Sequence, residues 1–75
     1  MLKELDRVVL AVDFPDYRLQ AGDMGVIVLV HGDGAGYEVE IFTAEGKTYE
    51  VITVEAAQIR PVQALEIAHA RPIKA

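Results

Sequence analysis

The sequence predicts an all-β fold, a small five-stranded and partly open barrel, and three observations support this prediction. Stretches in which apolar and polar residues alternate recur along the 75 residues, as expected for strands with one buried face. Turns that contain glycine or proline separate these stretches. The predicted strands are five to seven residues long, and short turns connect them except for one longer first loop. This pattern suits a five-stranded, partly open barrel.

The first half of the chain contains two predicted strands. Residues 7–12 form the first, which ends near Pro15 because proline has no amide hydrogen to give to a ladder. Residues 13–21 then form the long first loop. After a turn with two glycines, residues 26–30 form a second strand that is apolar on both faces, and the glycine-rich segment 31–36 forms a hairpin loop. One face of the second strand therefore points to the core, while the other is either covered or exposed.

The third predicted strand, residues 37–43, has the cleanest alternation in the chain. Its inward face carries Tyr37, Val39 and Ile41, and its outward face carries Glu38, Glu40 and Phe42. A tight turn at residues 44–47 leads to a fourth strand, residues 48–54, with which it forms a hairpin. We expect the outward face of this hairpin to hold three acidic and two apolar residues: Glu38, Glu40, Glu50, Phe42 and Ile52.

Two short elements complete the predicted barrel, and a tail follows it. Residues 55–58 predict a helical turn, and residues 59–62 predict a last strand in which Pro61 suits a sheet edge. The barrel domain, of the SH3-like type, is therefore expected over residues 1–62. Residues 63–75 do not fit the barrel. We expect them to form a C-terminal tail, which is either a short helix docked on its own barrel or on a neighbour, or disordered.

Composition narrows the class of protein. The absence of cysteine excludes a disulfide framework and a thiolate metal site. The N-terminal residues are charged where a signal peptide is apolar, and no stretch approaches the roughly 18 consecutive apolar residues of a membrane helix. We therefore expect a cytoplasmic protein without membrane association. Apolar residues make up 52% of the chain, which predicts a folded domain with some apolar surface left for an oligomer or a protein partner.

Charge is distributed unevenly along the chain. The net charge is −5, and residues 19–59 hold seven acidic side chains against one basic side chain. Nucleic acids bind through lysine and arginine side chains, so this acidic body opposes direct nucleic-acid binding. The alternative is that the acidic residues serve only to keep a small apolar barrel soluble.

The residue types that carry catalysis and metal binding are scarce. The chain has no serine or cysteine, and its two histidines are His31 and His69. A barrel filled by its own side chains leaves little room for the sheltered pocket that a catalytic carboxyl needs, so we expect no enzymatic activity and no cofactor. His31, Asp33 and Glu38 come closest to a set of metal ligands, but their spacing is not that of a zinc site, and we expect no metal.

Two surfaces are candidates for protein binding. The first is a groove between the first loop and the glycine loop, edged by Phe14, Tyr17, His31 and Asp33. The alternative is that Phe14 and Tyr17 fold back to plug one end of the barrel. The second is the acidic hairpin face around Phe42 and Ile52, since an apolar centre ringed by charge is typical of interfaces. The alternative is an ordinary solvated face whose two apolar residues are covered by the tail.

Four segments within residues 3–62 together resemble one bacterial domain-of-unknown-function family, numbered four-nine-two-six: Lys3–Leu10, Leu19–Val28, Tyr37–Ile41 and Gln58–Val62. The resemblance implies a single small SH3-like domain, often paired with a neighbouring small protein in toxin–antitoxin-like arrangements, and it implies no activity or site residue. Residues 22–30 also resemble the glycine–valine core of KOW-type domains, which use basic loops on RNA or protein. The equivalent loops here hold Asp23, Asp33 and Glu45, which opposes the RNA part of that analogy.

The resulting hypothesis is a non-enzymatic protein-binding module, an antitoxin-like or immunity-type partner of a small basic protein encoded next to it. One alternative is a structural homo-oligomerisation domain that forms a homodimer through its exposed apolar residues. A second alternative is a KOW-like RNA-associated domain, which the acidic charge opposes.

Overall fold

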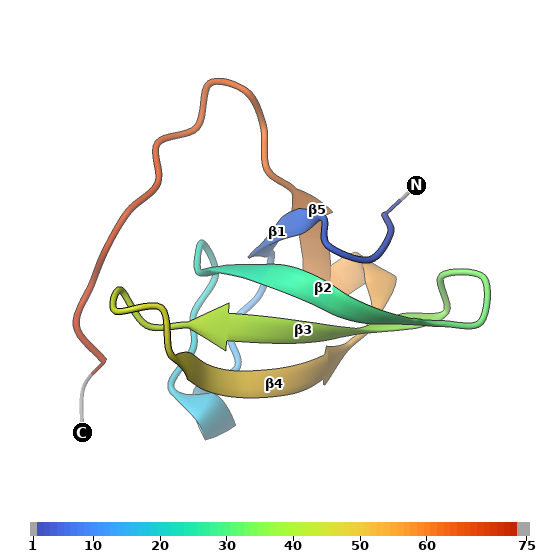
Figure 1. The fold of residues 1–75 in the computed structure, drawn as a ribbon, viewed down its shortest axis with the longest axis horizontal. Coiled ribbons are helices and arrows are strands. Elements are labelled where there is room, and N and C mark those ends of the chain that lie inside the picture. Colours follow the sequence, from blue (N-terminus) through green and yellow to red (C-terminus); the bar gives the residue numbers. More distant parts are fainter. Residues whose placement is uncertain (1, 74–75) are drawn as a thin grey trace.

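The computed structural model, which describes residues 2–73, contains one antiparallel five-stranded sheet (Figure 1). Its elements, with η denoting a 3-10 turn, are β1 (Arg7–Leu10), η1 (Pro15–Tyr17), β2 (Met24–His31), β3 (Gly36–Phe42), β4 (Thr48–Val54), η2 (Ala56–Gln58) and β5 (Ile59–Pro61). The strand order is β4-β3-β2-β1-β5, and the outer strands β4 and β5 are not paired, so the sheet is not closed. The prediction of an all-β, five-stranded and partly open SH3-like barrel is confirmed, and η2 lies where the sequence predicts a helical turn.

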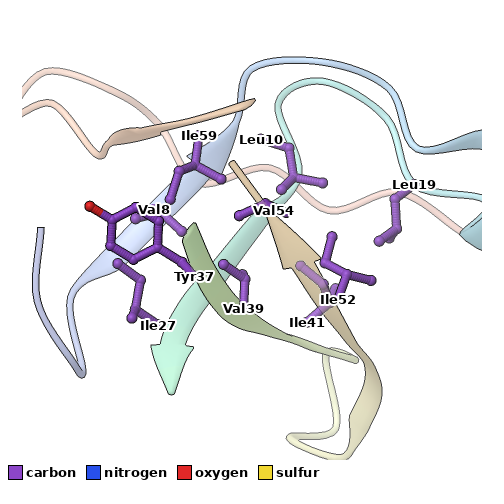
Figure 2. Packing of buried hydrophobic residues seen from close by; sticks show 10 residues of the cluster. All are labelled: Val8, Leu10, Leu19, Ile27, Tyr37, Val39, Ile41, Ile52, Val54 and Ile59. Atoms are coloured by element: carbon purple, nitrogen blue, oxygen red, sulfur yellow. The ribbon is translucent and has the colours of Figure 1, made fainter. Parts of the chain in front are cut away.

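The sheet bends around a single apolar core. Figure 2 shows side chains from all five strands and from the end of the first loop converging there. The members of this core are Val8, Leu10, Leu19, Ile27, Tyr37, Val39, Ile41, Ile52, Val54 and Ile59. No polar or charged residue is buried among the described residues. The core therefore lies within residues 8–59, and the described part of the tail adds no member to it.

The β3–β4 hairpin contains a β-bulge that the sequence analysis did not anticipate. Phe42 pairs with Thr48, but the preceding residue Ile41 pairs with Glu50, so Tyr49 is an extra residue on β4. Residues directly opposite each other point to the same face, and a shift of one residue turns the rest of a strand over. The bulge therefore reverses the two faces of β4 relative to a regular hairpin.

This reversal corrects the predicted position of Ile52. Ile52 pairs with the core residue Val39 and is 1% exposed, so its expected place on the outward face is wrong. Val51 and Thr53 point outward instead, and Val51 is 46% exposed. The inward face of β3 is buried as predicted, which shows that the error came from the register of the hairpin and not from the alternation.

The start of β2 passes very close to β3 at Gly25. A Cβ atom at this position would lie 2.6 Å from the Val39 side chain and 2.8 Å from the carbonyl oxygen of Glu40. Both distances are shorter than any ordinary carbon contact, so only glycine fits without moving the backbone of β3. Gly25 thus allows the sheet to curve tightly at the point where β2 also pairs with β1.

The C-terminal segment, residues 62–73, forms an arch that contains no helix. It has a turn at residues 64–65 and no further regular secondary structure up to residue 73. In Figure 1 it leaves β5, curves away from the sheet and returns beside the β3–β4 turn. Leu65 and Ile67 on this arch are 98% and 91% exposed. Residues 74–75 of the predicted tail lie outside the described residues.

Candidate protein-binding surfaces

Phe14 and Tyr17 lie at the η1 end of the barrel. Phe14 is half-buried and packs against the core, and its backbone exchanges two hydrogen bonds with Leu19 at 2.9 and 3.1 Å. The side chain of Tyr17 is exposed, and its carbonyl oxygen accepts a hydrogen bond from the Tyr49 hydroxyl at 2.8 Å. Phe14 is therefore engaged with its own barrel, whereas the Tyr17 ring remains accessible.

His31 and Asp33 lie at the other end of the sheet. The η1 turn contacts Tyr49 at the start of β4, whereas the hairpin at residues 31–36 adjoins the end of β4 near Val54. The seven residues of β3 separate these two ends, which corresponds to about 20 Å at the usual rise of a strand. The two ends of β3 can be followed in Figure 1. The structure does not bring the two edges of the expected groove together.

Glu38 is fixed on the outward face by two neighbours. Its Oε2 atom lies 2.6 Å from His31 Nε2, and the Thr53 hydroxyl donates to both carboxylate oxygens at 2.9 and 2.8 Å. These hydrogen bonds, the one with His31 first, hold the pKa of Glu38 below its ordinary value. The face therefore carries a positioned negative charge at neutral pH.

The other two glutamates of the predicted acidic face lie apart from each other. Glu40 is on the outward face, between Val26 of β2 and Val51 of β4, and accepts a hydrogen bond from the Thr48 hydroxyl. Glu50 pairs with the inward residue Ile41, so the register places it on the opposite side of the sheet. The structure thus brings Glu38 and Glu40 together with Phe42 but not with Glu50.

Exposed apolar side chains complete the outward face. Phe42 is 44% exposed at the end of β3, as predicted for it. Val28, Leu29 and Val51 are exposed as well, and none of them is among the predicted site residues. The second predicted strand is apolar on both faces, which allows an exposed apolar face, but Val28 and Leu29 are both exposed because a β-bulge between Ile27 and Leu29 interrupts the alternation. For Val51 the exposed position was hidden by the bulge in β4.

A second surface forms where the arch returns to the barrel, at Asp23. Arg71 donates from Nε to Asp23 Oδ1 at 2.9 Å and from Nη2 to Asp23 Oδ2 at 2.5 Å. Nη2 also donates to the carbonyl oxygen of Arg18 at 3.0 Å. Burial raises the pKa of Asp23, but the hydrogen bonds from Arg71 and from the backbone of Gln20 outweigh it and leave this pKa below its ordinary value.

An apolar pocket of about 350 Å³ adjoins this ion pair. Its walls come from the first loop, from the start of β2 and from the β3–β4 hairpin, and they include Leu19, Met24, Phe42 and Tyr49. Ile73 of the arch lines the same pocket. Local sequence patterns do not reveal this site, because Arg71 and Asp23 are 48 residues apart and neither lies in a local motif for ion pairing.

A second ion pair holds the beginning of the arch. Arg60 donates to the two carboxylate oxygens of Glu66 at 2.8 and 2.6 Å, and the backbone of Gln63 donates to Glu66 at 2.7 Å. These hydrogen bonds, the one from Arg60 first, lower the pKa of Glu66 to about 2. Between the two ion pairs, the arch and the barrel line an open cavity of about 560 Å³, to which Arg7 and His69 also contribute.

Two structural features are absent from the described residues. Within residues 2–73, no group of three or more histidine, cysteine, aspartate or glutamate side chains is placed to hold a metal ion. That same stretch contains no helix with the length and apolar character needed to cross a membrane.

The model of one protein family, described as domain of unknown function (DUF4926), matches residues 4–61. The chain belongs to this family. No curated protein and no solved structure matches the chain. The DUF4926 match confirms the resemblance noted in the sequence.

The DUF4926 match includes every member of the core and ends before the arch. Asp23 and Arg60 lie within the matched region, whereas their partners Arg71 and Glu66 lie beyond it. In both ion pairs the DUF4926 barrel supplies one side chain and the C-terminal segment supplies the other.

Proposed function

We propose that this DUF4926 protein is a cytoplasmic, non-enzymatic protein-binding module, an antitoxin-like partner that binds a small basic protein. The observation that supports this proposal most directly is the outward face of β2–β4. There Phe42, Leu29 and Val51 are exposed beside the carboxylates of Glu38 and Glu40.

The two kinds of side chain have separate roles in the proposed interface. Burial of the apolar side chains favours association by about 25 cal/mol for each Å² removed from water. The glutamates attract a basic surface and speed the encounter with it. A toxin that acts on nucleic acid must itself be basic to hold its substrate, so an acidic face is complementary to such a protein.

The test is co-purification of the tagged chain from its native host, followed by sizing of the eluted complex. Phe42→Lys and Glu40→Lys are each expected to remove a stoichiometric companion, since either change places a positive charge against a basic partner. Asp16→Lys in η1 makes the same charge change as Glu40→Lys, but in the exposed first loop, and serves as the control that keeps the companion.

Two results would contradict the proposal. A companion that is retained by Phe42→Lys and Glu40→Lys would show that it does not bind to this face. A homodimer without any companion would favour the alternative, a homo-oligomerisation domain that buries the exposed apolar residues Leu29 and Val51 against a second copy.

A further inference from the structure

Apart from the carbonyl oxygen of Pro72, the acceptor groups around Arg71 belong to the barrel and are positioned without the arch. The Asp23 carboxylate accepts a hydrogen bond from the backbone of Gln20 at 2.8 Å, and the carbonyl oxygen of Asp23 accepts one from the backbone of Leu10 at 2.8 Å. The Arg18 carbonyl oxygen lies at the end of the hydrogen-bonded η1 turn. A carboxylate and a carbonyl oxygen held in this way form a preorganised site for a guanidinium group.

The segment that occupies this site contributes nothing to the core of the barrel. The arch reaches Asp23 over an open cavity, and its middle residues Leu65 and Ile67 are almost fully exposed. The Arg71–Asp23 pair itself is largely shielded, with side-chain exposures of 24% and 17%. The arch is therefore attached mainly by its ends, and the barrel does not need it to complete its packing.

The surroundings of Arg71 include apolar side chains as well as charged groups. Arg71 contacts the carboxylate, and two residues later Ile73 lines the apolar pocket together with Leu19 and Phe42. The bound pattern is an arginine followed after one residue by an aliphatic side chain. Phe42 belongs both to this pocket and to the outward face, so the two surfaces are continuous.

We propose that the acceptor site formed by Asp23 and the Arg18 carbonyl oxygen, together with the pocket beside it, binds an arginine-bearing segment of the basic partner protein, and that the chain's own Arg71 occupies the acceptor site until the partner displaces it. This inference rests on the proposed function, because it concerns the same partner. It adds a second contact beside the outward face and the side-chain chemistry of that contact. The acidic charge of the barrel and the guanidinium-shaped set of acceptors match a basic ligand. The arch is thus a competitor for the binding site in the same chain.

The first experiment asks whether the pocket accepts this segment from outside. A chain ending at Val62 retains the DUF4926 barrel and every core residue, so it is expected to fold. A peptide with the sequence of residues 66–73 is titrated into this shortened chain, and amide chemical shifts are recorded by NMR. Shifts are expected at Leu19, Asp23 and Phe42, which line the pocket. The matched control peptide carries Arg71→Gln.

Asp23→Asn is the corresponding change in the barrel. Asparagine has the same shape, and its side-chain oxygen still accepts the hydrogen bond from Gln20, so the turn is preserved while the charge is lost. Both this variant and the control peptide are expected to weaken binding by about tenfold or more. The intact chain is expected to bind the peptide more weakly than the shortened chain, and Arg71→Gln in the intact chain is expected to restore the binding.

The outcomes separate this inference from the proposed function. Absence of shifts in the shortened chain at millimolar peptide, or equal binding of the Arg71→Gln peptide, would overturn the inference. The inference would also be overturned if the companion were lost with Phe42→Lys but retained unchanged with Asp23→Asn. That result would still support the proposed function. Two results together would support the inference and the proposed function. The peptide binds only with its arginine, and the binding of the companion is weakened by Asp23→Asn and strengthened by removal of the arch.

Discussion

The outward face of β2–β4 and the pocket beside Asp23 both combine a carboxylate with exposed apolar surface, but they are held in different ways. The face is part of the sheet, so its side chains are positioned by the same ladder and core that fold the barrel. At the pocket, the arch is held against Asp23 by one ion pair between residues 48 positions apart. The comparison indicates that the face is as stable as the barrel, whereas the arch can be released while the barrel stays folded.

The largest expected effect is on stability, and it distinguishes the buried side of β4 from its exposed side. Ile52→Ala is expected to reduce the free energy of unfolding by about 2–5 kcal/mol, because it leaves a cavity in the core. Val51→Ala, one residue away on the exposed side of β4, is expected to cost less than about 1 kcal/mol. Urea unfolding followed by circular dichroism measures both values. If Ile52→Ala does not fold, Ile52→Val with an expected loss of about 1 kcal/mol replaces it. Equal losses at the two positions would contradict the shifted register.

A smaller effect is expected when the arch is released. Arg71→Gln removes the charge that holds the arch at Asp23, so the amides of residues 67–71 are expected to gain fast motion in ¹⁵N relaxation measurements. The barrel amides are expected to stay rigid, and the free energy of unfolding is expected to change by less than about 1 kcal/mol, because the arch adds nothing to the core. General loosening of β3 and β4 in this variant would show that the arch and the barrel are not separable.

The smallest expected effect is the dependence of arch docking on pH. The docked state lowers the pKa of Asp23, so docking is fully favoured above the ordinary aspartate pKa of about 4 and is lost as the pH falls through the lowered value. A titration of the Asp23 carboxyl carbon by NMR measures this value. Arg71→Gln is expected to raise the midpoint toward the ordinary aspartate value. An unchanged midpoint would mean that Arg71 does not set the charge state of Asp23.

Local patterns in the sequence predicted most of the barrel. The alternation in residues 37–43 identified the buried side of β3, and the turn chemistry placed η2 and the last strand. The position of Ile52 could not be predicted in this way, since alternation alone does not show where a bulge resets the register. A strand in which both faces carry apolar residues offers no polar side to reveal the error.

The candidate sites depended more on contacts between distant residues. The predicted groove does not form, because η1 and the 31–36 hairpin lie at opposite ends of the sheet. Their positions depend on how the whole barrel curves, which local patterns do not reveal. The pair formed by Arg71 and Asp23 likewise follows from the path of the arch through space. By contrast, Glu38, Glu40 and Phe42 were placed correctly on one face because neighbouring positions on a single strand determine that face.

The extra residue at Tyr49 has a consequence for how this surface can change in evolution. An in-frame deletion of the single Tyr49 codon would leave every other residue of β4 in place and restore a regular hairpin. Glu50, Val51 and Ile52 would keep their present partners on β3, so Val51 would stay on the outward face and Ile52 would stay in the core. One codon can therefore be lost at this point of the strand without exchanging the two faces of β4.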